Sequence, residues 1–286
     1  MLPTRSHALY EEKRKLTEEK CRTIVIIYDF DGTLARGNIQ EDVFFKKIGV
    51  DSESFWREAH ELAKTHDMDA ILAYMWLTIQ KAQQSKVLLT REVFSQSGQK
   101  ARLFAGLDDW FKRINNYAKK HDYLVEHAIV SCGPREMILG VPIAKYFSHI
   151  FASSFAFDDQ GHATWPALAI NHTNKVQFLF RINKGSFELW DDTELNAFFP
   201  EEYRPIPFSR MIYIGDGETD VAAMRMLNYQ GGHSVVVYDP DKSSARMQAE
   251  TLLKHKRAGY IAPADYTKGQ SLERICKTLI DYIALK

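Results

Sequence analysis

Two pairs of carboxylates each follow an apolar run of the sequence. Asp29 and Asp31 follow a β-branched run, and Asp216 and Asp220 follow another apolar segment. One carboxylate of such a pair can attack phosphorus in covalent catalysis, and the second can carry a proton. Clustered carboxylates repel each other unless a cation compensates, and hard oxygen ligands suit Mg²⁺. These residue types therefore predict phosphoryl-transfer chemistry at a magnesium site.

Each pair also has a simpler explanation, and both explanations stay open on these residues alone. Asp and Gly after a strand often form only a turn. Asp220 in the first turn of a helix would stabilise the helix dipole. A calcium-binding loop is excluded, because it needs Gly at its sixth position and Glu at its twelfth, where this sequence has Leu34 and Gln40.

Two further segments could bind a phosphoryl group. Ser131, Cys132 and Gly133 follow an apolar run, so a hydroxyl and exposed backbone N–H groups could hold a phosphate oxygen there. The alternative is that Ser131 caps a helix. Lys184 lies at the C-terminal end of a predicted helix, where the helix dipole explains a cation, whereas Lys175 opens that helix. Lys175 is therefore the better functional candidate.

Short apolar strands that alternate with helices must position these residues. The run 23–28 is continuous and β-branched, as in a strand buried on both faces of a parallel sheet. Alternation of strands and helices favours βαβ units, and ligands of such sheets bind at the carboxyl ends of the strands. The predicted strands are 23–28, 125–130, 150–157, 162–168, 211–214, 234–238 and 260–261.

The region from about 40 to 103 has no convincing strand and several segments with helical periodicity. Apolar residues recur at helical intervals in 41–48, 52–65 and 69–84. Asp51 and Ser52 are plausible N-caps of the second segment. The acidic, aromatic and proline-bearing segment 186–207 is interpreted as a surface excursion.

Composition argues for a soluble protein without a nucleic-acid or membrane partner. The 286 residues carry 37 basic and 37 acidic side chains, so no overall field favours an anionic partner. Cys21, Cys132 and Cys276 are widely spaced and suggest neither a disulfide framework nor a zinc site. The N-terminus is too charged for a signal peptide, and no run approaches a membrane span. We expect a cytoplasmic protein, whose oligomeric state the sequence leaves open.

Taken in order, the motifs resemble those of the haloacid dehalogenase superfamily. Its phosphatases carry D-x-D-x-T/V, then Ser or Thr at a strand end, then Lys, then an acidic G-D-x-x-x-D motif. This sequence supplies 28–34, 131–133, Lys175 and 215–220 in that order. The resemblance implies an α/β fold, with a Rossmann-like parallel sheet covered by helices on both faces. It also implies a mainly helical C1 cap at 38–103, with the catalytic core formed by 1–37 and 104–286.

The resemblance implies roles for the catalytic and phosphate-binding residues. Asp29 would be the nucleophile, and Asp31 would be the general acid and base. Ser131 and the backbone at Cys132 would bind the phosphoryl group, and Lys175 would neutralise charge around it.

It also implies a set of Mg²⁺ ligands. Asp29 and Asp216 would bind the ion directly, and Asp31 would bind it through its backbone carbonyl. Asp220 would be a further ligand or would lie beside the ligands.

Within the superfamily, the helical cap and Gly-Asp-Gly-x-x-Asp resemble the phosphoserine phosphatase branch. Those enzymes place a substrate-binding Glu nine residues after the nucleophile, where this sequence has Asn38. Glu41 or Asp42 could substitute for that Glu. Dehalogenation is not implied, because the dehalogenases lack the second Asp of the first motif and Asp31 is present here.

We therefore expect a Mg²⁺-dependent phosphomonoesterase that acts through an aspartyl-phosphate on a small phosphorylated metabolite. Arg36, Asn38 and Arg135 are the candidate substrate contacts, although each could equally be a solvated loop residue. A phosphotransferase or mutase would share the aspartyl-phosphate, and a non-catalytic module could retain the fold to bind a phosphorylated ligand. A receiver domain is shorter and has no large insertion.

Overall fold

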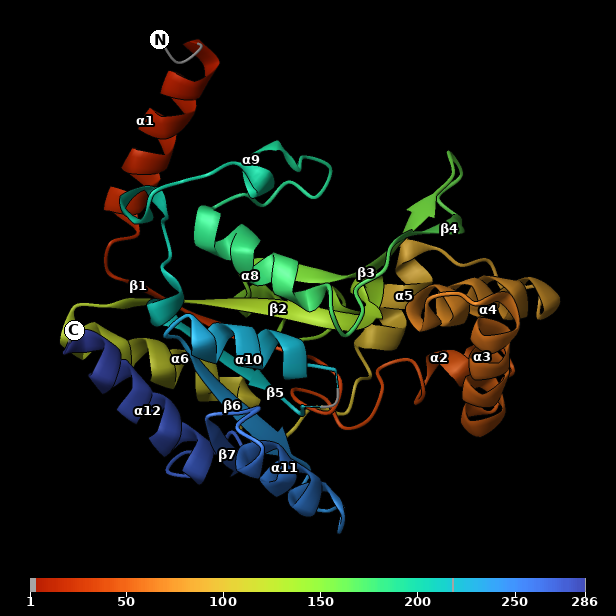
Figure 1. Ribbon diagram of the computed structural model, residues 1–286. Coiled ribbons are helices and arrows are strands. Elements are labelled where there is room, and N and C mark those ends of the chain that lie inside the picture. The colour runs from red at the N-terminus through yellow and green to blue at the C-terminus, as the bar shows by residue number, and fades with distance from the viewer. Residues whose placement is uncertain (1–3, 218, 286) are drawn as a thin grey trace.

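The computed structural model describes residues 4–217 and 219–285 and places a seven-stranded sheet at its centre (Figure 1). The strand order is β4-β3-β2-β1-β5-β6-β7, and every neighbouring pair is parallel except β3 and β4. The α/β fold with a largely parallel sheet is thus confirmed. The strands are β1 (Thr23–Tyr28), β2 (Leu124–Pro134), β3 (His149–Phe157), β4 (Ala163–Leu168), β5 (Met211–Gly215), β6 (His233–Tyr238) and β7 (Tyr260–Pro263).

The central strand β1 brings the motifs to one edge of the sheet. All of its side chains are buried, as its β-branched sequence predicts. Tyr28, its last residue, pairs with Ile129 on β2 and with Ile214 on β5. The residues that follow β1, β2 and β5 therefore emerge side by side, which is the arrangement that a parallel sheet offers for a ligand site.

Helices cover both faces of the sheet, each through its own apolar cluster. The helices α6 (Leu107–Ala118) and α12 (Ser271–Ala284) pack on one face, where Trp110 of α6 is fully buried. The helices α8 (Lys175–Lys184), α10 (Val221–Tyr229) and α11 (Ala245–Lys254) pack on the other face. The short helix α7 (Arg135–Ile138) directly follows β2.

A helical insert, defined here as residues 38–103, follows the first motif and lies to one side of the sheet in Figure 1. Its helices are α2 (Phe44–Lys47), α3 (Ser52–His66), α4 (Ala70–Gln84) and α5 (Arg91–Gly98). Asp51 caps α3 by accepting a hydrogen bond from the Ser54 N–H. The helix expected at 41–48 is shorter than its periodicity suggested, and α5 was not among the expected helices.

The β3–β4 hairpin holds this insert against the sheet. The Ala163 N–H donates to the Leu89 carbonyl at 2.8 Å, and Thr90 forms an isolated β-bridge with His162. The rings of Phe94 and Phe155 stack with their centroids 5.2 Å apart. The insert therefore meets the rest of the chain through backbone pairing as well as apolar packing.

The segment 186–207 was expected to be a surface excursion, but buried contacts attach it to the rest of the protein. It contains the short helix α9 (Thr193–Asn196), and its Phe199 side chain is buried. The buried Arg181 guanidinium donates to the Glu188 carbonyl at 2.9 Å and to Asp192 at 2.7 Å. Lys13, from the N-terminal helix α1 (Thr4–Glu19), forms an ion pair with Glu194 at 2.7 Å.

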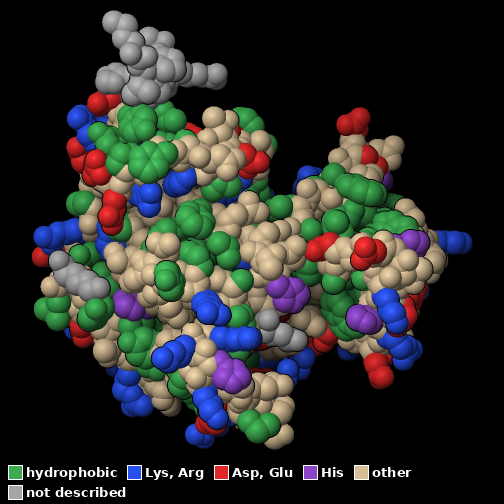
Figure 2. All heavy atoms as spheres, in the orientation of Figure 1, with side chains coloured by type: hydrophobic (Ala, Val, Ile, Leu, Met, Phe, Trp, Pro, Cys, Tyr) green, Lys and Arg blue, Asp and Glu red, His purple; other side chains and the backbone are tan. Residues whose placement is uncertain are grey.

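The balanced total charge is unevenly distributed over the surface. Lys and Arg side chains gather over α10 and α11 on the face shown in Figure 2, whereas both signs lie on α1 and α3. Within 4–217 and 219–285, no helix has the length and apolar character needed to cross a membrane.

Candidate active site

Asp29 emerges from the end of β1 into a nearly closed environment. Its backbone N–H donates to the Ile214 carbonyl at 2.9 Å, which ties the first residue after β1 to β5. Its Oδ1 atom accepts a hydrogen bond from the Phe30 N–H at 2.7 Å, and only 4% of the residue is exposed. The side chain is thus held in one orientation at the carboxyl edge of the sheet.

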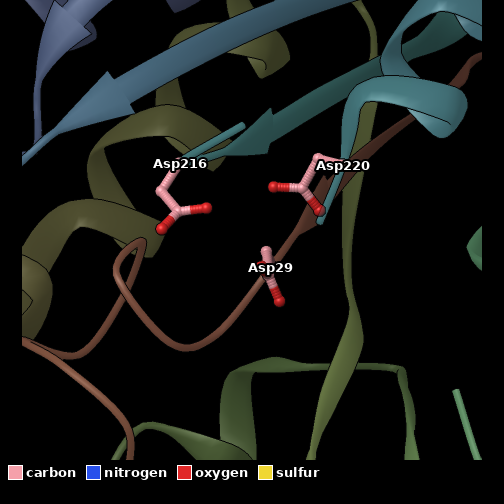
Figure 3. A group of neighbouring side chains, drawn as sticks. All are labelled: Asp29, Asp216 and Asp220. Carbon is pink, nitrogen blue, oxygen red and sulfur yellow. The ribbon is translucent and has the colours of Figure 1, made fainter. Parts of the chain in front are cut away.

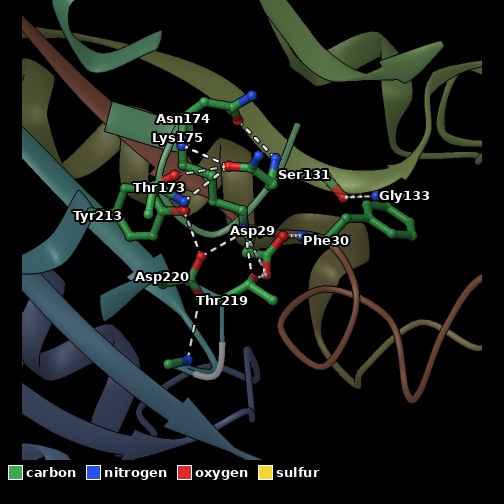
Figure 4. Close-up of polar contacts among 12 residues, drawn as sticks. Asp29, Phe30, Ser131, Gly133, Thr173, Asn174, Lys175, Tyr213, Thr219 and Asp220 are labelled. Carbon is green, nitrogen blue, oxygen red and sulfur yellow. Dashed lines mark hydrogen bonds and ion pairs between the residues drawn. The ribbon is translucent and has the colours of Figure 1, made fainter. Parts of the chain in front are cut away.

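Lys175 supplies the cation for this buried carboxylate. Its ammonium lies 3.0 Å from Asp29 Oδ2 and 2.7 Å from Asp220 Oδ1, and it donates to the Thr219 hydroxyl at 2.8 Å (Figure 4). Burial alone would lower the pKa of the Lys175 ammonium, but the Asp220 and Asp29 carboxylates outweigh burial and hold the pKa above its usual range. Lys175 is therefore charged.

Three carboxylates converge beside this lysine. One oxygen from each of Asp29, Asp216 and Asp220 lies within 4.8 Å of the others, and the three residues come from the ends of β1 and β5 and the turn before α10 (Figure 3). Burial and then Asp220 raise the pKa of Asp29 to about 6, against the lowering effect of Lys175. One lysine therefore does not balance the cluster, and hard oxygen donors with excess negative charge fit Mg²⁺.

The hydrogen bonds of Asp220 distinguish it from Asp216. Besides Lys175, the Asp220 carboxylate accepts hydrogen bonds from the Tyr213 hydroxyl at 2.7 Å and from the Gly217 N–H at 3.2 Å. Asp220 is fully buried, whereas Asp216 is partly exposed. Asp216 is thus the more exposed of the two carboxylates, and the contacts of Asp220 tie it to Lys175 and to the turn.

Gly32 lets the first motif pack against Asp216. Its φ of +72° lies in the left-handed region, and a Cβ atom at this position would lie 2.3 Å from Asp216 Oδ2. A side chain here would displace the carboxylate, so the glycine of the first motif is needed for the close approach of the two acidic motifs.

The Asp31 carboxyl group lies apart from the three clustered carboxylates. Its Oδ1 atom accepts a hydrogen bond from the Ile39 N–H at 2.8 Å. A Cβ atom on Gly133 would lie 3.0 Å from Asp31 Oδ2, so this carboxyl faces the loop after Ser131. Burial, followed by the Asp29 charge, raises the pKa of Asp31 to about 8. Asp31 can therefore hold a proton near neutral pH.

Ser131 and Cys132 meet the site in different ways. The buried Ser131 hydroxyl accepts a hydrogen bond from the Gly133 N–H at 3.0 Å. This bond shapes the segment 131–134 beside Asp31, where the pairing of β2 with β3 is irregular, and we call this segment the Ser131 loop. The Cys132 carbonyl accepts a hydrogen bond from the Tyr74 hydroxyl at 2.7 Å. Burial raises the pKa of the Cys132 thiol to about 12, so this cysteine stays neutral.

The three candidate substrate contacts are engaged elsewhere or lie in another cavity. Arg36 forms ion pairs with Asp239 at 2.8 Å and with Asp241 at 2.6 Å. The Asn38 amide donates to the Glu41 carboxylate at 2.6 Å. Arg135 lines a cavity of about 400 Å³ together with His149, Phe187 and Trp190. Arg36 and Asn38 thus have acidic partners in the protein, and Arg135 borders a cavity formed with β3 and the segment 186–207.

Two residues that the sequence did not single out contact the clustered carboxylates. The Thr219 hydroxyl donates to Asp29 Oδ2 at 3.3 Å, and Tyr213 donates to Asp220. Thr219 directly precedes Asp220 in the acidic motif, and this position could have identified it as a contact of the site. Tyr213 lies within an apolar strand, where its sequence gives no sign of a polar partner.

The family comparison agrees with this geometry. The family model described as haloacid dehalogenase-like hydrolase matches residues 26–225, so the chain belongs to this family. An uncharacterized protein of Borreliella burgdorferi is 33% identical over 291 aligned positions, which cover 90% of this chain and 98% of that protein.

Solved structures with the same fold include two of phosphoserine phosphatase. The apo form matches with a TM-score of 0.54 and 16% identity, over 89% of this chain and 98% of the other. A phospho-aspartyl intermediate analogue of phosphoserine phosphatase matches with a TM-score of 0.53 and 16% identity, over 90% and 99% of the two chains. These similarities confirm the expected fold, including its resemblance to the phosphoserine phosphatase branch.

Proposed function

We propose that this hydrolase is a Mg²⁺-dependent phosphomonoesterase that forms an aspartyl-phosphate on Asp29. The main support is the buried contact of the Lys175 ammonium with Asp29 and Asp220, beside the partly exposed carboxylate of Asp216. Phosphoryl transfer depends mainly on positioning and charge neutralisation, and this arrangement offers both next to a fixed carboxylate.

In the first half of the reaction, an Asp29 carboxylate oxygen bonds to phosphorus as the bond from phosphorus to the leaving oxygen breaks. Asp31 gives its proton to that oxygen, which its raised pKa permits near neutral pH. Lys175 and the Ser131 loop stabilise the charge on the transferred phosphoryl group.

In the second half, Asp31 takes a proton from a water molecule as the water oxygen bonds to phosphorus. The bond between Asp29 and phosphorus breaks, which releases inorganic phosphate and restores the Asp29 carboxylate. Asp31 thus returns to its protonated form, and all atoms and charges balance over the cycle.

Asp29 and Asp216 would hold Mg²⁺, with the Asp31 backbone carbonyl as a further ligand and Asp220 beside them. The bound ion would neutralise phosphate oxygens and the carboxylate cluster. Burial and then the Asp220 charge raise the pKa of Asp29, and a cation bound beside the carboxylate would offset both effects.

The insert would act as the cap of this site. We place it at 38–103, with the catalytic core formed by 1–37 and 104–286. Closure of such a segment excludes water and retains the substrate until the product leaves. The substrate is a small phosphorylated metabolite, and the protein works in the cytoplasm without a nucleic-acid or membrane partner.

Purified protein tests this proposal with a nitrophenyl phosphate as substrate. We expect phosphate release that requires Mg²⁺, stops with a chelator and is lost in Asp29→Asn. The matched control is Asp159→Asn, at an exposed position in the β3–β4 turn, which should retain full activity. An Asp29→Asn variant with wild-type activity would refute the nucleophile assignment. Phosphate release without an added acceptor separates a phosphatase from a phosphotransferase.

A further inference from the structure

The helix α4 makes polar contacts with both loops that carry the phosphate-binding residues. We propose that Asp69 and Tyr74 of the insert position the Lys175 and Ser131 loops, so that the phosphoryl site is complete only while α4 lies against them. This inference rests on the proposed function, because it gives Ser131 and Lys175 their phosphate-binding roles. Asp69 and Tyr74 are positioning residues, since each acts through a loop.

The first link runs from Asp69 to the loop before Lys175. The two oxygens of Asp69 have different partners. Oδ1 caps α4 by accepting hydrogen bonds from the N–H groups of Ile71 at 2.9 Å and Leu72 at 3.0 Å. Oδ2 accepts a hydrogen bond from the Asn171 side-chain amide at 2.9 Å. An N-cap needs only one oxygen, so the second is available to hold a loop 102 positions further along.

Asn171 in turn organises the loop that leads to Lys175. Its Oδ1 atom accepts hydrogen bonds from the N–H groups of Thr173 at 3.1 Å and Asn174 at 2.9 Å. Its own N–H donates to the Asn174 side chain at 2.7 Å, and its carbonyl accepts from the Lys175 N–H at 3.3 Å. Figure 4 shows Thr173, Asn174 and Lys175 next to Asp29 and Ser131. The orientation of the Asn171 amide therefore fixes the start of α8, from which the Lys175 ammonium reaches Asp29.

The second link runs from Tyr74 to the Ser131 loop at the irregular end of β2. The Tyr74 hydroxyl donates to the Cys132 carbonyl at 2.7 Å, and its ring packs edge-on against Trp56 with the centroids 5.6 Å apart. Cys132 lies between Ser131 and Gly133, whose hydrogen bond shapes the loop. Tyr74 lies on α4, so a displaced α4 would leave the Cys132 carbonyl without this partner.

The two links predict a selective effect on the site. Both loops contribute phosphoryl-binding groups, whereas the candidate metal ligands Asp29 and Asp216 follow β1 and β5. Loss of either link should therefore weaken phosphate binding and turnover more than Mg²⁺ activation, which only the Lys175 contact with Asp29 couples to these loops. A merely structural role would instead lower stability and impair both properties together.

The Asp69–Asn171 pair allows a reversal test. Asp69→Asn keeps the capping oxygen, because Asn is also a good N-cap, but it turns an N–H group toward the Asn171 amide. We expect kcat/KM for a nitrophenyl phosphate to fall about tenfold or more, since a hydrogen bond to a charged group is lost. The double variant Asp69→Asn with Asn171→Asp restores a donor opposite an acceptor and should recover most of the loss. Asp67→Asn, at an exposed left-handed position nearby, is the matched control.

Two further readouts complete the test. Inhibition by inorganic phosphate should weaken in Asp69→Asn and in Tyr74→Phe. The Mg²⁺ concentration for half-maximal activity should stay at the wild-type value in Tyr74→Phe and should change less than the phosphate inhibition in Asp69→Asn. Hydrogen exchange should quicken in 169–175 in Asp69→Asn and in 131–134 in Tyr74→Phe, and the strand β1 should exchange at the wild-type rate in both variants.

The outcomes separate this inference from the proposed function. Wild-type protein without phosphatase activity would refute the function, and the exchange measurement would still decide the positioning role. Unchanged exchange in both loops would overturn the inference. If the wild-type enzyme is active, unchanged kcat/KM and unchanged phosphate inhibition in both variants would also overturn the inference. A fall in kcat/KM in Asp69→Asn that the double variant does not recover would overturn it as well.

Discussion

Replacement of Lys175 by Met tests the electrostatic basis of the site. The Lys175 side chain is fully buried, and its ammonium lies within 3.0 Å of both Asp29 and Asp220. Met has a similar length and no charge, so Lys175→Met leaves two buried carboxylates without their cation. Removing one partner of a buried ion pair costs about 3–5 kcal/mol. We expect the free energy of unfolding to fall by about this amount near pH 8.

The loss of stability should depend on pH in a direction that follows from Asp29. Its pKa in the folded protein is about 6, above the ordinary value of 3.8, although Lys175 lowers it. Without Lys175 the folded-state pKa rises further, so the folded variant binds a proton that the unfolded chain releases. When a carboxyl group has a higher pKa in the folded than in the unfolded state, the free energy of unfolding increases as the pH falls toward the pKa of that group in the unfolded chain. The deficit should therefore shrink between about pH 8 and about pH 5.5.

Urea denaturation followed by circular dichroism in metal-free buffer measures both effects. Lys268→Met, at an exposed position, is the matched control and should match wild type at both pH values. A deficit below about 1 kcal/mol near pH 8 would show that the buried pair is not needed. An equal deficit at both pH values would contradict the role assigned to the carboxylates.

Three further variants probe single features of the site. Gly32→Ala should raise the Mg²⁺ concentration for half-maximal activity about tenfold or more, because the added Cβ displaces Asp216. Gly161→Ala is the control, since Gly161 has a φ of +80° and no atom within 4 Å of the added Cβ, and it should leave that concentration unchanged. Asp31→Asn should lower kcat by about 10²–10⁴-fold. The loss should be larger for an alkyl than for a nitrophenyl phosphate, because the poorer leaving group needs the proton. Equal losses in steady-state assays of both substrates would count against Asp31 as the general acid. Tyr213→Phe should lower the free energy of unfolding by about 1–3 kcal/mol through loss of a buried donor to Asp220, as urea denaturation would measure, and no change would argue against that hydrogen bond.

The strands and the acidic motifs could be predicted because local patterns encode them. The buried run 23–28 has the composition of a central parallel strand, and the structure places it there. Parallel strands end at a common edge, so the order of the motifs was enough to predict that Asp29, Ser131 and Asp216 would lie close together. Helix periodicity likewise predicted α3 and α4 within a residue or two of their ends.

Contacts between distant segments could not be predicted in this way. Arg36 follows the first motif and suggested a substrate contact, but it pairs with acidic residues more than 200 positions away. The buried Arg181 anchors the segment 186–207, whose composition suggested only a surface excursion. Asp69 was expected at the start of α4, but its second oxygen bonds to Asn171, and no local pattern encodes such a pair.

The aspartyl-phosphate on Asp29 is the central claim, and mass spectrometry of the trapped enzyme tests it most directly. Enzyme mixed with a nitrophenyl phosphate and Mg²⁺ is quenched in acid during turnover, digested and mapped. We predict the added mass of one phosphoryl group on the peptide that contains Asp29, and its absence in Asp29→Asn. A phosphoryl group on another residue, or turnover in Asp29→Asn at the wild-type rate, would contradict the account.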